Sequence, residues 1–99
     1  MSDRPLVSII MNCYNGETFL RDAINSIFQQ TYDNWEIIFF DNSSTDSSKE
    51  IACSYGAKLT YVCSTELLTL GAARKEAVKH AKGEWICFLD TDDIWYPNK

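Results

Sequence analysis

Short apolar runs and longer amphipathic segments alternate along the chain, and the short runs predict β-strands. Each run is rich in Val, Ile, Leu, Phe or Tyr and is bounded by polar residues, as strands of a parallel sheet usually are. The expected strands cover residues 6–11, 35–40, 58–63 and 84–89. Residues 85–89 are all apolar, so we expect the last strand to be buried.

Three helices are expected between these strands. Residues 17–30 form the first, because apolar side chains recur there with helical spacing and make one wide face. Those side chains are Phe19, Leu20, Ala23, Ile24, Ile27 and Phe28. The second helix should have Ser44 as its N-cap, carry Asp46 in its first turn and end near Tyr55. The third should span 71–82, and a glycine follows each of the last two.

The alternation of strand and helix predicts an α/β fold, a Rossmann-like parallel sheet with helices on both faces. Right-handed crossovers favour the strand order 3-2-1-4. The chain has 99 residues, which allows one small domain at most. Parallel sheets bind their ligands at the carboxyl ends of the strands, near the point where the strand order reverses. In the expected order, the first and fourth strands flank that point.

Polar residues gather where these strands end. Residues 12–15 follow the first strand, Asp41 and Asn42 follow the second, and an Asp-x-Asp-Asp motif at 90–93 follows the fourth. Carboxylates spaced this closely repel one another unless a cation compensates them. Mg²⁺ and Mn²⁺ prefer oxygen ligands of this kind. The sequence therefore predicts a site for Mg²⁺ or Mn²⁺ at this edge of the sheet.

Charge and hydropathy exclude several classes of protein. The net charge is −5 and no basic run occurs, so nucleic acid is not expected as a partner. No segment approaches the roughly 18 apolar residues of a membrane span. The first residues lack the layout of a signal peptide. A cytoplasmic location is therefore the default expectation, with membrane association of a longer parent protein left open.

Common nucleotide-binding and hydrolase motifs are absent from the sequence. The loop after the first strand lacks the G-x-G-x-x-G of NAD and FAD sites, and the chain has neither a P-loop nor a G-x-S-x-G elbow. The single histidine, His80, is expected to be an exposed helical residue. The four cysteines are too far apart for a zinc site, and we expect Cys63 and Cys87 to be buried free thiols.

Four blocks of the chain, in order and with natural spacing, resemble the GT-A glycosyltransferases of family 2. Residues 7–15 look like the opening strand of that family. Residues 35–46 resemble its second strand and Asp-x-x-Ser-x-Asp loop, and residues 70–74 are similar to its Gly-Ala-Ala-Arg helix start. Residues 82–93 resemble its strand and DxD motif. The resemblance implies that residues 1–99 are the N-terminal, nucleotide-diphospho-sugar-binding part of a GT-A domain that is incomplete at its C-terminus.

The resemblance also implies the ligands and their contacts. The donor is a nucleotide sugar, most often a UDP-sugar, and the acceptor is a saccharide or a lipid-linked molecule. The residues expected to bind the donor are Asn12, Cys13, Tyr14, Asn15, Asp41, Arg74 and Asp90. Among them, Asp41 would contact the base, Arg74 the base and phosphates, and Asp90 the ribose. Asp92 would contact the metal ion, and Asp93 would support that site.

Family members invert the anomeric centre, and a carboxylate deprotonates the acceptor hydroxyl. No residue of this chain is assigned as that base, because in the family it lies downstream of DxD, here beyond Lys99. The chain alone is therefore expected to bind the donor at best. The chain also departs from the family pattern, since Asn12 stands where Pro is usual, Lys75 replaces an Asn, and residues 67–69 replace an Asn-x-Gly.

Two other classes of function stay open at this point. One is a non-catalytic module that binds a nucleotide sugar or a partner protein. The other, less favoured, is a receiver-like signalling domain, which would need an acidic pair after the first strand. A chain cut after the acidic motif would also leave the fourth strand with an unpaired apolar edge, so we expect a homodimer or segment exchange through that edge.

Overall fold

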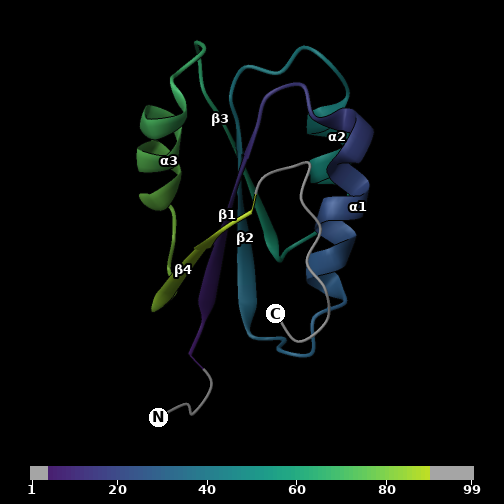
Figure 1. Ribbon diagram of the computed structural model, residues 1–99, viewed down its shortest axis with the longest axis vertical. Helices are drawn as coiled ribbons and strands as arrows, with labels where there is room; N and C mark the ends of the chain where they lie inside the picture. Colours follow the sequence, from purple (N-terminus) through teal and green to yellow (C-terminus); the bar gives the residue numbers. More distant parts are fainter. Residues whose placement is uncertain (1–4, 90–99) are drawn as a thin grey trace.

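The structure is a computed structural model, and it describes residues 5–89. Strands and helices alternate along these residues as expected (Figure 1). The elements, in chain order, are β1 (Val7–Cys13), α1 (Glu17–Phe28), β2 (Trp35–Asp41), α2 (Ser48–Cys53), β3 (Leu59–Cys63), α3 (Leu70–Val78) and β4 (Trp85–Phe88). Among the described residues, no helix is long and apolar enough to cross a membrane.

The strands form one parallel sheet in the order β3-β2-β1-β4, so the predicted order is confirmed. β1 lies between β2 and β4, with Cys13 opposite Asp41 on β2 and Ile10 opposite Phe88 on β4. Helices α1 and α2 cover one face and α3 covers the other, as Figure 1 shows. The carboxyl ends of β1 and β2 therefore reach the same edge of the sheet.

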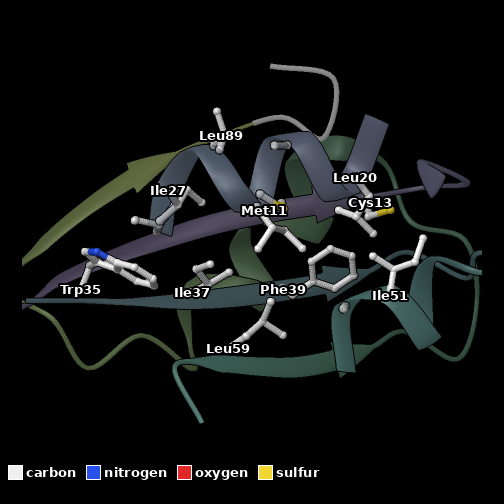
Figure 2. Packing of buried hydrophobic residues seen from close by; sticks show 14 residues of the cluster. Met11, Cys13, Leu20, Ile27, Trp35, Ile37, Phe39, Ile51, Leu59 and Leu89 are labelled. Atoms are coloured by element: carbon white, nitrogen blue, oxygen red, sulfur yellow. The ribbon is translucent and has the colours of Figure 1, made fainter. Parts of the chain in front are cut away.

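Alternation along the strands divides the core into two clusters. Met11 and Phe39 belong to the larger one, which fills the space between the sheet and the helices α1 and α2 (Figure 2). Ile10 and Phe40 belong to the smaller one, together with Ala73 of α3. Both faces of β1 are thus buried, which explains why its sequence is an almost continuous apolar run.

The apolar face of α1 is narrower than the sequence suggested. Leu20, Ala23 and Ile27 are fully buried, but Phe19 and Phe28 remain 55% and 42% exposed. At about 100° per residue, these two phenylalanines lie on opposite flanks of the buried stripe.

The ring of Phe28 contributes to packing at the side of the helix instead. Its centroid lies 4.9 Å from that of Trp35, with the rings edge to face, and 5.6 Å from that of Tyr55, with the rings stacked.

The predicted start of α2 is wrong. Ser44 is not its N-cap, because the helix begins at Ser48 and ends at Cys53. The N–H of Ser44 instead donates to Oδ1 of Asp41 at 2.9 Å, and its hydroxyl accepts from the N–H of Asn15 at 2.9 Å. A partner distant in sequence therefore competes with local capping and holds residue 44 outside the helix.

Helix α3 also differs from its predicted range. It begins at Leu70, where Thr69 is the N-cap and its hydroxyl accepts from the N–H of Ala72 at 3.2 Å. It ends at Val78, earlier than expected, and the next residues form a turn in which the N–H of His80 donates to the carbonyl oxygen of Ala77 and the N–H of Ala81 to that of Val78, both at 3.0 Å. The N–H of Lys82 donates to Oε2 of Glu36 at 2.7 Å, and this turn leads the chain into β4.

The expectation that the fourth strand is buried is wrong for most of its side chains. Trp85 is 62% exposed and Phe88 is 46% exposed, whereas Leu89, just after the strand, is buried. β4 pairs with β1 alone among the described strands, so no strand within residues 5–89 pairs with its outer edge. The predicted dimerisation through this edge stays a prediction.

The prediction that the thiols of Cys63 and Cys87 are buried is wrong for Cys63 and only partly right for Cys87. Cys63 is exposed, because it ends the edge strand β3, and Cys87 is half-buried. All four cysteines are free. His80 is exposed, as expected, in the turn that follows α3.

Gly83 should tolerate no side chain. A Cβ there would lie 2.6 Å from the carbonyl oxygen of Leu6 and 2.8 Å from the backbone nitrogen of Ser8, and backbone atoms cannot move aside cheaply. We expect Gly83→Ala to lower the free energy of unfolding by about 1–3 kcal/mol, measured by urea denaturation.

The matched control for this substitution is Gly71→Ala in α3. A Cβ at residue 71 would meet nothing within 4 Å, so alanine there should leave stability unchanged or raise it by about 0.5–1 kcal/mol. Equal effects of the two alanines would contradict the close approach at Gly83.

Candidate functional site

The loops that follow β1 and β2 are bound to each other at the carboxyl edge of the sheet. Asn15 adopts a left-handed backbone conformation with φ of 50°. Its Oδ1 accepts from the N–H of Thr45 at 2.7 Å, while its own N–H donates to Ser44. The side chain of Asn15 thus has a structural partner, and its carbonyl oxygen holds the second loop against the first.

The N-terminal ends of α1 and α2 cap each other. Oδ2 of Asp46 accepts from the N–H of Glu17 at 3.1 Å, and Oε2 of Glu17 accepts from the N–H of Ser47 at 3.1 Å. Oδ1 of Asp46 also accepts from the N–H of Ser48 at 2.9 Å. Each carboxylate therefore satisfies free N–H groups at the start of a helix, where the helix dipole favours negative charge.

The pKa of Asp46 reflects this arrangement. Desolvation alone would raise it, but the hydroxyl and N–H of Ser48 and the N–H of Glu17 outweigh that effect and hold the pKa of Asp46 below its usual value of 3.8. The ionised carboxylate is the form that binds both helix starts.

Asp41 ends β2 and is only 3% exposed. Its side chain lies on the face covered by α1 and α2, where one oxygen accepts from the N–H of Ser44 and the other from the hydroxyl of Tyr61. Burial, and then the bonded carboxylate, raise the pKa of Tyr61 far above its usual range. Tyr61 therefore stays protonated and donates to Asp41.

Cys13 lies beside Asp41 in the sheet and is buried on the same face. Burial raises the pKa of its thiol, although the hydroxyl of Ser48 opposes the shift. The side chain of Cys13 faces the core. At the edge of the sheet, the backbone carbonyl oxygen of Cys13 accepts from the N–H of Asn42 at 2.7 Å.

Asn42 has a role that the sequence did not indicate. Its Nδ2 donates to the carbonyl oxygen of Leu68 at 2.8 Å, and its Oδ1 accepts from the N–H of Leu68 at 2.8 Å. This pair of bonds fixes the segment that leads to Thr69 and the start of α3. A polar residue directly after a buried strand was the available signal, but its partner could not be read from the sequence.

Asn12 and Arg74 lie on the opposite face, the one covered by α3. Asn12 lies two residues after Ile10 on β1 and so shares its face, and Ile10 packs under α3. Arg74 is half-buried, with its guanidinium 5.1 Å from the centre of the Phe88 ring on β4. Tyr14, in the loop after β1, is 55% exposed. The structure thus divides the predicted donor-binding residues between the two faces of the sheet.

The acidic residues Asp90, Asp92 and Asp93 lie outside the described residues. Within residues 5–89, no group of three or more His, Cys, Asp or Glu side chains could hold a metal ion. A groove of about 460 Å³ lies between β3 and α3, but none of the predicted donor-binding residues lines it. Its lining includes Phe40, Val62, Glu66 and His80.

These features define a Rossmann-like α/β unit whose loops form a polar edge at the carboxyl ends of the strands. Residues 8–99 match the model of glycosyl transferase family 2, and the chain belongs to this family.

Curated relatives agree with this membership. An uncharacterized glycosyltransferase of Rickettsia typhi is 45% identical over 96% of the chain and 30% of its own length. The UDP-Glc:alpha-D-GlcNAc-diphosphoundecaprenol beta-1,3-glucosyltransferase WfgD of Escherichia coli is 40% identical over 98% of the chain and 39% of its own length. The chain therefore spans about a third of the length of these relatives.

Solved structures resemble the chain as well. TarS 1–349 of S. aureus in complex with UDP-GlcNAc has a TM-score of 0.86 and 29% identity over 91% of the chain and 27% of that protein. The mannosyltransferase PcManGT of Pyrobaculum calidifontis, in complex with GDP-Man and Mn²⁺, has a TM-score of 0.86 and 28% identity over 95% of the chain and 29% of that protein. The fold of the chain is thus that of the corresponding part of GT-A glycosyltransferases.

The caps between α1 and α2 should make stability depend on acid. The folded-state pKa of Asp46 lies below its unfolded value of 3.8, so its contribution is complete above that value and is lost as the pH falls through the folded pKa. We expect Asp46→Asn to be less stable than the parent chain near neutral pH, and the difference to shrink below about pH 4, measured by urea denaturation.

The control for this prediction is Asp22→Asn, which changes an exposed carboxylate on α1. It should have little effect on stability across the same pH range. A difference between Asp46→Asn and the parent chain that does not change with pH would contradict the capping role of the ionised carboxylate.

Proposed function

We propose that the chain is the donor-binding part of an inverting glycosyltransferase. The enzyme would move a sugar from a nucleotide-diphosphate sugar, in the first instance a UDP-sugar, to an acceptor hydroxyl. The observation that carries the proposal is the polar edge of the sheet, where the loops after β1 and β2 meet in a chain that matches family 2 over residues 8–99. The glucosyl and mannosyl transferases among its relatives support a sugar donor.

Different residues of the edge would contact different parts of the donor. Asn12 and Tyr14 would contact the nucleoside, and Arg74 would place its positive charge near the phosphates. Asp41 and Asn15, whose side chains bind other residues of the edge, would shape the pocket and offer their remaining lone pairs to the base. A site of this kind is built before the ligand arrives, which limits the entropy lost on binding.

The Asp-x-Asp-Asp motif fits a divalent metal ion by its chemistry, since carboxylate oxygens are the ligands that Mg²⁺ and Mn²⁺ prefer. Asp92 would hold the metal and Asp93 would support it, while Asp90 would contact the ribose. When bound, the metal ion would stabilise the negative charge on the departing nucleoside diphosphate.

Transfer also needs a carboxylate base, which we assign to none of the residues of this chain, and an acceptor molecule. The base is expected beyond Lys99, and the acceptor is a saccharide or a lipid-linked molecule. The E. coli relative, whose name specifies a diphosphoundecaprenol acceptor, supports the lipid-linked class. A sugar-transfer assay on the longer parent protein would separate an enzyme from a module that only binds the donor.

Thermal denaturation with UDP and Mn²⁺ tests donor binding. At a UDP concentration about 100 times its Kd, binding stabilises the folded state by roughly 2.7 kcal/mol. Each kcal/mol corresponds to about 4–8 °C in Tm for a domain of this size. We therefore expect a rise of roughly 10–20 °C with UDP and Mn²⁺, and a smaller one with UDP alone.

Asp92→Ala should abolish the metal-dependent part of this shift, because it removes the expected metal ligand. Asp22→Ala on the exposed side of α1 is the matched control and should keep the full shift. If no nucleoside diphosphate raises Tm in the presence of Mn²⁺ or Mg²⁺, the proposed function is contradicted.

A further inference from the structure

A polar network joins the two central strands of the sheet to the turn that precedes β4. The hydroxyl of Ser8 on β1 donates to Oε2 of Glu36 on β2 at 2.6 Å and accepts from the N–H of Gly83 at 2.8 Å. The same oxygen of Glu36 also accepts from the N–H of Lys82 at 2.7 Å. One carboxylate oxygen and one hydroxyl therefore fix the backbone from which β4 begins.

The network lies on the face of the sheet that α3 covers (Figure 1). Ser8 stands two residues before Ile10, and Glu36 stands two residues before Ile38, so both share the face of the smaller core cluster. Ser8 is fully buried and Glu36 is half-buried. Buried polar groups cost free energy unless they are bonded, and bonds to a carboxylate are among the stronger ones. Loss of the carboxylate would therefore weaken the attachment of the turn.

Few other contacts stabilise β4 among the described residues. The strand pairs only with β1 within residues 5–89, and the side chains of Trp85 and Phe88 are exposed. Its ladder with β1 continues to the N–H of Leu89, which donates to the carbonyl oxygen of Ile10 at 3.0 Å. A short strand with little buried apolar surface opens locally more readily than the central strands do. The bonds at its start therefore matter for keeping it paired.

The turn also defines the register of β4. The close approach of Gly83 to Leu6 and its bond to Ser8 place residue 83 at one position beside β1. A slip by one residue would move the end of β4 by about 3.3 Å and turn its side chains to the other face. Metal–ligand distances tolerate changes of only about 0.2 Å. Because residues 90–93 follow directly in the sequence, the register of β4 decides where the acidic motif begins.

We propose that Glu36 is a positioning residue for the metal site. Through Ser8 and the turn at residues 82–83, its carboxylate keeps β4 paired with β1 in one register and so sets where the acidic motif leaves the sheet. Glu36 is the second residue of β2, so it acts from the amino-terminal end of the strands and is not expected to contact donor or metal. This inference rests on the proposed function, which assigns the metal to the acidic motif.

Hydrogen exchange of backbone amides, followed by NMR, tests the effect on β4. In Glu36→Ala the amide of Leu89 should exchange roughly tenfold to a hundredfold faster, because two hydrogen bonds to a carboxylate are lost at the start of the strand. Ile51→Val is the matched control, since it removes a buried methyl group from α2, which packs on β2 and β3. It should lower the free energy of unfolding but leave the Leu89 amide at the parent rate, because the opening of β4 does not break its contacts.

Binding of Mn²⁺ at saturating UDP, measured by electron paramagnetic resonance of the free ion, tests the link to the metal site. Well below Tm all variants are folded, so a loss of global stability alone would leave the Kd unchanged. In Glu36→Ala we expect the Kd for Mn²⁺ to rise about twofold to tenfold, because only molecules with β4 in place bind the ion. Ile51→Val should keep the parent Kd.

Two further variants separate the carboxylate from the rest of the network. Glu36→Gln keeps an oxygen that can accept from both Ser8 and Lys82, so its Kd for Mn²⁺ should lie within about twofold of the parent value. Ser8→Ala removes the link to Gly83 but leaves the bond between Glu36 and Lys82. It should show the same changes as Glu36→Ala at smaller size, and it replaces that variant if Glu36→Ala does not fold.

Several results would overturn the inference. One is an unchanged exchange rate of the Leu89 amide in Glu36→Ala and Ser8→Ala, and another is equally faster exchange in Ile51→Val. Faster exchange with an unchanged Kd for Mn²⁺ would remove the link to the metal site. If the parent chain does not bind Mn²⁺ with UDP, the proposed function is contradicted and this link fails with it, but the exchange rates still decide whether Glu36 holds β4 in place.

Discussion

The parallel pairing of β1 between β2 and β4 determines most of this structure. Cys13 lies opposite Asp41, and Ile10 lies opposite Phe88, so the loops after these strands reach one edge. Both faces of β1 are buried, and the side-chain alternation sends Asn12 toward α3 and Cys13 toward α1 and α2. A shift of the register by one residue would exchange these two side chains and dismantle both the core and the candidate site.

The loops at this edge are held by polar contacts that cross between elements. Asp46 and Glu17 cap the starts of α1 and α2 reciprocally, and Asn42 holds Leu68 near the start of α3. These contacts set the backbone positions of the loops without a ligand. The chain belongs to glycosyl transferase family 2, and its fold resembles that of the corresponding parts of TarS and PcManGT.

Elements governed by local pattern were predictable from the sequence, whereas features governed by distant partners were not. The period of apolar residues predicted the strands and most of the buried stripe of α1, and the right-handed crossover rule predicted the strand order. The start of α2 was missed because Ser44 bonds to Asn15, 29 residues away. The burial of β4 was overestimated because an apolar run does not reveal whether a strand lies at the edge of the described sheet.

The sequence named candidate residues for the site, but it did not show how they are arranged. The resemblance to family 2 pointed to Asn12, Asp41 and Arg74, yet only the register shows that Asp41 faces α1 and α2 while the other two face α3. A crystal structure with UDP and Mn²⁺ tests this most directly. We expect the nucleoside over the carboxyl ends of β1 and β2, in contact with Asn12 and Asp41, and the Mn²⁺ ion on Asp92. A nucleoside bound elsewhere, or an edge without ligand at saturating UDP, would contradict the central claim.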